Sequence, residues 1–93
     1  MITTFKCDET YKIWLGNLSR KLPRDIQDVA RRKLRMLNNA KQLTDLKIPP
    51  NNCLEALKGK RKGQYSIRIN KQWRICFVWQ QNNVFEVEIV DYH

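Results

Sequence analysis

From residue 64 onward, apolar and polar side chains alternate along the chain, and this period of two is typical of β-strands with one buried face. Two interruptions, at residues 70–72 and 80–83, divide the alternation into three runs. Because short turns join the runs, we expect antiparallel strands. The positions predicted to point inward are Tyr65, Ile67, Ile69, Trp73, Ile75, Phe77, Trp79, Phe85, Val87 and Ile89.

The register of the first hairpin follows from the requirement that its apolar faces coincide. A two-residue loop would set Ile67 opposite Arg74 and mix the two faces. A three-residue loop over residues 70–72 sets Ile67 opposite Ile75 instead. The three-residue loop is therefore preferred, and it places Arg68 directly across from Arg74.

The residues that alternate with these inward-pointing positions are predicted to form an exposed, mostly charged face. Two arginines directly opposite each other repel. Either neighbouring glutamates neutralise them, or the anion arrives as a ligand, and phosphate fits the planar guanidinium fork. Asp91 and His93 start on the opposite parity and reach this face only if the strand end bends. The residues assigned to the exposed face are Arg68, Arg74, Glu86, Glu88 and Tyr92.

Upstream of the strands, the sequence predicts a short first strand over residues 2–7 and two helices. Asp8 is suited to cap the first helix and Gly16 to end it. The second helix follows Pro23 and ends at Asn38-Asn39. Its apolar stripe is Ile26, Val29, Ala30, Leu34 and Leu37, and its basic residues Arg31, Arg32, Lys33 and Arg35 are expected on the solvent side.

These elements predict a single domain over residues 1–93 of the α/β (α+β) class. Its expected order is an N-terminal strand, two helices and a mainly antiparallel sheet, with the helices on one face. Residues 44–52 contain Pro49 and Pro50 and are expected to form a turn-rich loop.

Positive charge is concentrated in two segments. The net charge is +9, with eight basic and two acidic residues over 20–41 and seven basic and one acidic over 55–74. Two basic segments on one small domain indicate a polyanionic partner such as a nucleic acid.

The cysteines and the lone histidine argue against a disulfide framework, a metal site and a cofactor. Cys7, Cys53 and Cys76 are odd in number and lack a C-x-x-C spacing, which indicates a reducing compartment. His93 is the single histidine. The start of the chain does not read as a signal peptide, and no apolar run is long enough to span a membrane. We therefore expect a cytoplasmic protein with no membrane partner.

The basic face has candidate residues for cleaving RNA. Internal cleavage needs a base for the 2′-hydroxyl, an acid for the leaving 5′-oxygen and cations for the charge on the phosphorane. Arg68, Arg74 and Lys58 can supply the cations, and Tyr92 and His93 are the candidates for proton transfer. Nearby cations are expected to favour the phenolate of Tyr92.

Three sequence features resemble the HigB branch of the RelE toxin superfamily. They are "LKG" at 57–59, "G-x-x-S-I-x-x-N-x-x-W-R-I" across 63–75, and the closing Asp-Tyr-His. The resemblance implies a metal-independent endoribonuclease that enters the ribosomal A site and cuts mRNA with the RNA's own 2′-hydroxyl. It also implies a HigA-type helix-turn-helix antitoxin, through which operator DNA is bound.

The resemblance also assigns site residues by position. Lys58 and Arg74 match phosphate-facing basic residues, and the family's closing catalytic motif falls on Asp91, Tyr92 and His93. Contacts to ribosomal RNA are implied for basic residues elsewhere. These are Arg31, Arg32, Lys60 and Arg61, to which the basic face adds Arg68.

One departure concerns "LEALKG", because relatives often have "LHPLKG" there. Glu55 replaces a histidine proposed to assist proton transfer, and Ala56 replaces a proline. We expect Glu55 to hold Lys58 or Arg74 in place. The alternatives are a non-catalytic basic RNA- or DNA-binding module, a ParE-like toxin that poisons gyrase, and a protein that only binds its antitoxin. The closing Asp-Tyr-His and Arg74 favour the nuclease.

Overall fold

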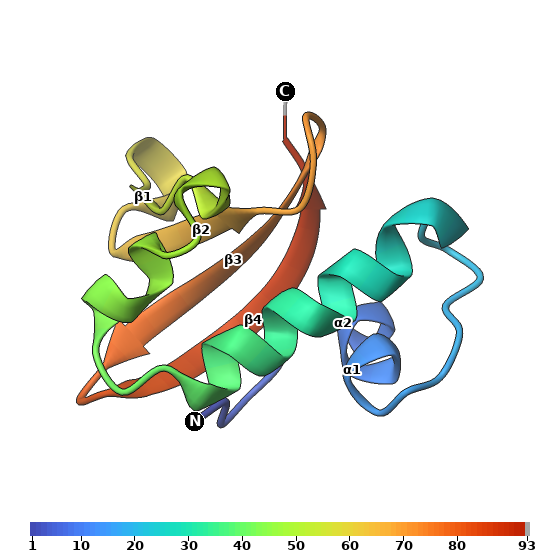
Figure 1. The fold of residues 1–93 in the computed structure, drawn as a ribbon, viewed down its shortest axis with the longest axis horizontal. Coiled ribbons are helices and arrows are strands. Elements are labelled where there is room, and N and C mark those ends of the chain that lie inside the picture. Colours follow the sequence, from blue (N-terminus) through green and yellow to red (C-terminus); the bar gives the residue numbers. More distant parts are fainter. Residues whose placement is uncertain (93) are drawn as a thin grey trace.

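The computed structural model describes residues 1–92 and shows an α+β fold (Figure 1). The strands form one antiparallel sheet in the order β1-β2-β3-β4. Two α-helices precede it, and short 3-10 helices lie between α2 and β2. The elements are α1 (Asp8–Trp14), α2 (Arg24–Asn39), η1 (Leu43–Lys47), η2 (Pro50–Asn52), β1 (Glu55–Ala56), η3 (Gly59–Arg61), β2 (Gln64–Arg68), β3 (Trp73–Gln80) and β4 (Asn83–Asp91). The predicted fold class is confirmed, while β1 was not predicted.

The register predicted for the first hairpin is correct. Ile67 pairs with Ile75 and Arg68 pairs with Arg74, and the Ile69 amide donates to the Trp73 carbonyl at 2.8 Å. The connection is thus the three-residue loop over 70–72. The next turn is tighter, because Gln81 and Asn82 both have positive φ, at 51° and 63°, between paired Gln80 and Asn83.

The inward parity predicted for Phe85 is wrong, because a β-bulge interrupts β4. Glu86 has a φ of +52°, and the pairing shifts between Cys76 and Val78 of β3. The extra residue reverses the alternation on its N-terminal side. Val84 is therefore fully buried in the core, while Phe85 is half-buried opposite Val78.

The predicted first strand is present as two separate parallel bridges to β4. Ile2 pairs with Val84 and Phe5 with Val87, on either side of the bulge. Between them, the Glu86 amide donates to Thr4 Oγ1 at 2.9 Å. The bulge thus explains why this segment is not a continuous strand.

The core lies between the two helices and one face of the sheet. Figure 1 shows α2 running across the molecule with α1 beside it. The predicted stripe of α2 is buried except Val29, which is half-buried. The solvent position predicted for Lys33 is wrong, since this side chain is among the buried residues of α2. The buried cluster is Ile13, Ile26, Ala30, Leu34, Leu37, Ala40, Leu46, Ile67, Ile75, Phe77, Val84, Val87 and Ile89.

No helix in the described part of the chain is long and apolar enough to cross a membrane.

Candidate RNA-cleaving face

The sheet face turned away from α1 and α2, here called the outer face, is built around Arg74. We predicted Arg74 to be exposed, but it is only 8% exposed. Its Nε donates to Ser66 Oγ at 2.7 Å, and its Nη2 donates to the Cys53 carbonyl at 2.5 Å. Cys53 ends η2 in a left-handed conformation with φ of 48°, so the segment before β1 folds over the guanidinium. The position of this charge is therefore fixed by the fold.

Tyr92 lies over Arg74 at the end of β4. The guanidinium carbon is 5.6 Å from the centre of the phenol ring, a cation–π distance. The Tyr92 hydroxyl donates to Glu55 Oε1 at 3.2 Å, and the Tyr92 amide donates to the Gln72 carbonyl at 2.6 Å. The predicted placement of Tyr92 on the face of Arg74 agrees with this geometry.

The phenolate expected at Tyr92 is not supported. The Glu55 carboxylate, the largest influence, raises the pKa of Tyr92 above its ordinary value and outweighs the opposing effect of Arg74. In this arrangement Tyr92 keeps its proton and acts as a hydrogen-bond donor. The expectation that Glu55 holds Lys58 or Arg74 is also wrong, since among residues 1–92 its side-chain hydrogen bond is with Tyr92.

Glu88 and Arg61 form the other half of the outer face. Arg61 Nη1 lies 2.7 Å from Glu88 Oε1, and this bond raises the pKa of Arg61. Glu88 therefore pairs with Arg61 rather than with the arginines of β2 and β3. Cys76, opposite Glu88, is fully buried, and burial raises the pKa of its thiol.

Arg68 and Arg31 both bond to backbone carbonyls away from Arg74. Arg68 is paired with Arg74 along the backbone, but its Nε donates to the Asn70 carbonyl at 3.0 Å. Arg31 was expected on the solvent side of its helix. Its Nε instead donates to the Ile13 carbonyl at 2.9 Å, so the side chain contacts the end of α1.

The other predicted site residues lie mainly at the surface. Lys58 and Lys60 are exposed around η3, and Arg32 is exposed on α2. Asp91 Oδ2 accepts a hydrogen bond from Gln72 Nε2 at 3.0 Å. His93 lies outside the described residues.

Sequence reasoning missed two partners of Arg74. Ser66 could have been found, because it shares the outer parity and lies across from Cys76, two residues from Arg74. The Cys53 carbonyl could not, because it arrives from a loop far away in the sequence. Within residues 1–92, no cluster of three His, Cys, Asp or Glu side chains could hold a metal ion.

The fold resembles that of a toxin–antitoxin protein of known structure. Two solved structures of the YoeB–YefM complex from Staphylococcus aureus, one of them described as a heterotetrameric toxin–antitoxin complex, match with TM-scores of 0.59 and 0.58, both at 22% identity. Each match covers 100% of this chain and 95% of the other.

Sequence comparison gives the family. The chain belongs to the HigB-like toxins, described as RelE-like toxins of the type II toxin–antitoxin system HigB, and that family model matches residues 3–93. Toxin HigB-1 of Vibrio cholerae is 47% identical over 60 residues, covering 64% of this chain and 63% of the relative. A Haemophilus influenzae protein described as uncharacterized is 37% identical over 81 residues, covering 86% of this chain and 80% of the relative.

Proposed function

We propose that the protein is an mRNA endoribonuclease that acts in the ribosomal A site and thereby inhibits translation. In this reaction the 2′-oxygen attacks the adjacent phosphorus and the bond to the 5′-oxygen breaks. The 2′-hydroxyl loses its proton and the leaving 5′-oxygen gains one. The protein acts in the cytoplasm, and a HigA-type antitoxin neutralises it.

The observation that carries the proposal is the Arg74 guanidinium held beneath Tyr92 on the outer face. The bonds from Nε and Nη2 to Ser66 and Cys53 fix its position before substrate arrives. A prearranged cation stabilises the charge that develops on a phosphorane without reorganising during the step. Lys58, exposed beyond β1, supplies a second cation.

Proton transfer is assigned to the end of the chain. Tyr92 is protonated and already donates a hydrogen bond, which suits it to orient the phosphate or to protonate the leaving oxygen. His93 is the candidate base for the 2′-hydroxyl. Asp91 pairs with Trp73 of β3, and its carboxylate accepts a hydrogen bond from Gln72, so we assign it a supporting role at the strand end.

Dependence on the ribosome follows from this small set of acids and bases. Where acid–base groups are few, positioning must supply the remaining rate, and a bound mRNA held in line for attack supplies it. The purified protein is therefore expected to leave naked RNA intact.

Primer extension on a reporter mRNA tests the proposal. Expression of the protein should give discrete breaks inside translated codons, and blocking initiation should abolish them. Breaks that persist without translation, or efficient cleavage of naked RNA by nuclease-free protein, would contradict ribosome dependence.

A further inference from the structure

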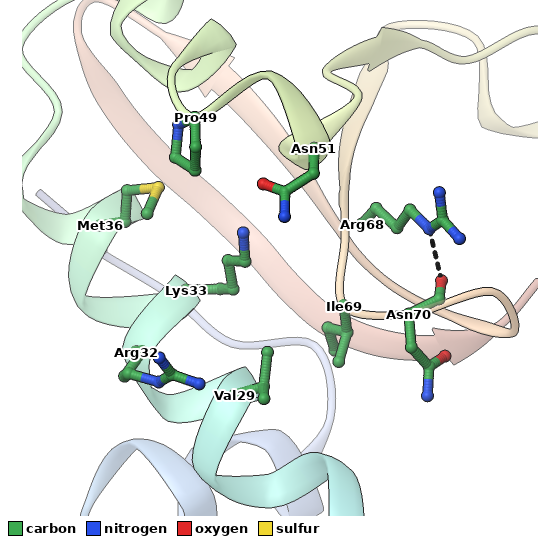
Figure 2. Close-up of a pocket in the computed structure, with 9 residues that line it drawn as sticks. All are labelled: Val29, Arg32, Lys33, Met36, Pro49, Asn51, Arg68, Ile69 and Asn70. Atoms are coloured by element: carbon green, nitrogen blue, oxygen red, sulfur yellow. Dashed lines mark hydrogen bonds between the residues drawn. The ribbon is translucent and has the colours of Figure 1, made fainter.

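A pocket of about 620 Å³ lies away from the outer face, between α2, the segment around η2 and the start of the β2–β3 loop (Figure 2). Neither Arg74 nor Tyr92 lines it. Among residues 1–92, cationic and apolar side chains contribute together to its wall, and no carboxylate does. The cations are Arg32, Lys33 and Arg68, and the apolar side chains include Val29, Met36 and Ile69.

Lys33 is the unusual member of this wall, because it is a lysine only 9% exposed. Its ammonium donates a hydrogen bond to Asn52 Oδ1. Asn52 is itself fully buried, and its Nδ2 donates to the carbonyls of Leu46 at 3.1 Å and Ile48 at 3.3 Å. The amide is thus oriented by the loop so that its oxygen faces the lysine.

The bond to Asn52 satisfies a donor of Lys33 but leaves its charge unbalanced. An amide oxygen carries no net charge, and a buried charge is costly unless an opposite charge accompanies it. Burial, followed by the repulsion of nearby Arg32, lowers the pKa of Lys33. A bound anion would relieve both effects, so the chemistry of this wall favours an anionic ligand.

The pocket is also connected to the outer face. Arg68 is the backbone partner of Arg74 and lines the pocket, and Figure 2 shows its guanidinium turned away from Lys33 and bonded to the Asn70 carbonyl. Paired residues on adjacent strands lie within about 5 Å of each other. Arg68 therefore borders both Arg74, on the neighbouring strand, and the wall that contains Lys33.

We propose that this pocket binds a backbone phosphate of RNA, with Lys33 contacting its oxygens and Arg32 and Arg68 at the rim. The apolar side chains then contact the attached sugar or base. The assignment rests on the RNA-directed function proposed above and adds a second phosphate site to it. Guanidinium and ammonium groups are the usual ligands of such phosphates.

The test compares Lys33→Met with Arg35→Met, which removes an exposed charge from the same helix outside the pocket. Binding is measured across a salt series with two probes. One is a short single-stranded RNA, 2′-O-methylated so that it cannot be cleaved, and the other is ribosomes without mRNA. Lys33→Met should weaken binding about tenfold and lower the salt slope by about 0.7, as expected for one phosphate contact on a single strand. Arg35→Met should change affinity less than about twofold.

The two probes distinguish the source of the phosphate. A loss with the oligonucleotide assigns the pocket to the mRNA strand, and a loss with ribosomes alone assigns it to ribosomal RNA. Unchanged affinity and slope with both probes would overturn the proposal. So would binding of an oligo-glutamate peptide that Lys33→Met abolishes while RNA binding persists, because the pocket would then serve an acidic protein segment.

Arg68→Gln provides a second variant in case Lys33→Met does not fold. The side-chain bond of Arg68 is made at the surface within its own hairpin, so this change should leave the fold intact. Arg68→Gln should weaken binding of the same probe, RNA or ribosomes, whose binding Lys33→Met weakens. Binding is read without cleavage, so a failure of ribosome-dependent cleavage in primer extension is distinguishable from a failure of this site.

Discussion

Replacing Arg74 by alanine is the sharpest test of the outer face, because the sequence and the structure predict opposite effects on stability. An exposed arginine opposite Arg68 should cost stability by repulsion, so its removal would raise stability by about 0.2–1 kcal/mol. The structure instead buries Arg74 and engages it with Ser66 and the Cys53 carbonyl. Its removal should therefore destabilise the fold.

The magnitude follows from the bonds that are lost. Each hydrogen bond to a charged group contributes about 1.5–3 kcal/mol, so the two short bonds together contribute about 3–6 kcal/mol. Relief of the buried charge and of the repulsion by Arg68 offsets part of this loss. We expect a net loss of about 2–3 kcal/mol in the free energy of unfolding, and a fall in Tm of about 8–24 °C for a domain of this size.

Thermal and urea unfolding of Arg74→Ala measures this loss, and Arg68→Ala is the matched control. Arg68 lies directly across the same strand pair, but in the described part of the chain its side chain bonds only to the Asn70 carbonyl, at the surface. The control should stay within about 0.5 kcal/mol of the parent. If Arg74→Ala melts at the parent's temperature, the guanidinium is not held by Ser66 and Cys53, and the reasoning fails. Cleavage by the folded fraction should fall by about two orders of magnitude or more.

The remaining predictions concern the end of β4. Tyr92→Phe should lower cleavage by about two orders of magnitude and change melting only slightly, because it removes only the hydroxyl and its exposed bond to Glu55; full activity would exclude a role for that group. Glu55→Gln should lower the pKa of Tyr92, as followed by NMR during a pH titration, and an unchanged pKa would exclude Glu55 as its cause. Since this pKa is raised in the folded state, the Glu55–Tyr92 contribution to stability is present below pH of about 10 and disappears as pH rises through the folded value. His93→Gln should slow cleavage in primer extension; if it is inactive while Tyr92→Phe is not, the histidine is the sole proton carrier.

The sheet was predictable where neighbouring residues decide the geometry. Ile67 and Ile75 must face the same core, and a single loop length satisfies this, so the pairing of Arg68 with Arg74 followed from parity. The bulge at Glu86 was not predictable in this way. A positive φ at a glutamate has no local signal, and Phe85 and Val84 are comparably apolar candidates for the core.

The sequence predicted which residues form the candidate site, but not which of their side chains are buried. Parity placed Arg74 and Tyr92 together, whereas the burial of Arg74 depends on a loop that ends at Cys53. The same applies to Lys33, whose partner Asn52 is 19 residues away in the sequence. The density of charge along the sequence predicts that such residues are exposed to solvent. It cannot identify the buried ones, because tertiary contacts decide which cations are buried.

The bridges of the N-terminal segment to β4 have a consequence for synthesis of the protein. The amides of Thr3 and Lys6 donate to the carbonyls of Val84 and Val87. Residues translated first therefore form these hydrogen bonds only after residues near the end of the chain have been translated. Tyr92 follows that same strand. The nascent chain therefore cannot assemble its edge or its outer face until β4 has left the ribosome. The ribosome that makes the protein is consequently not exposed to a finished outer face while β4 is still being made.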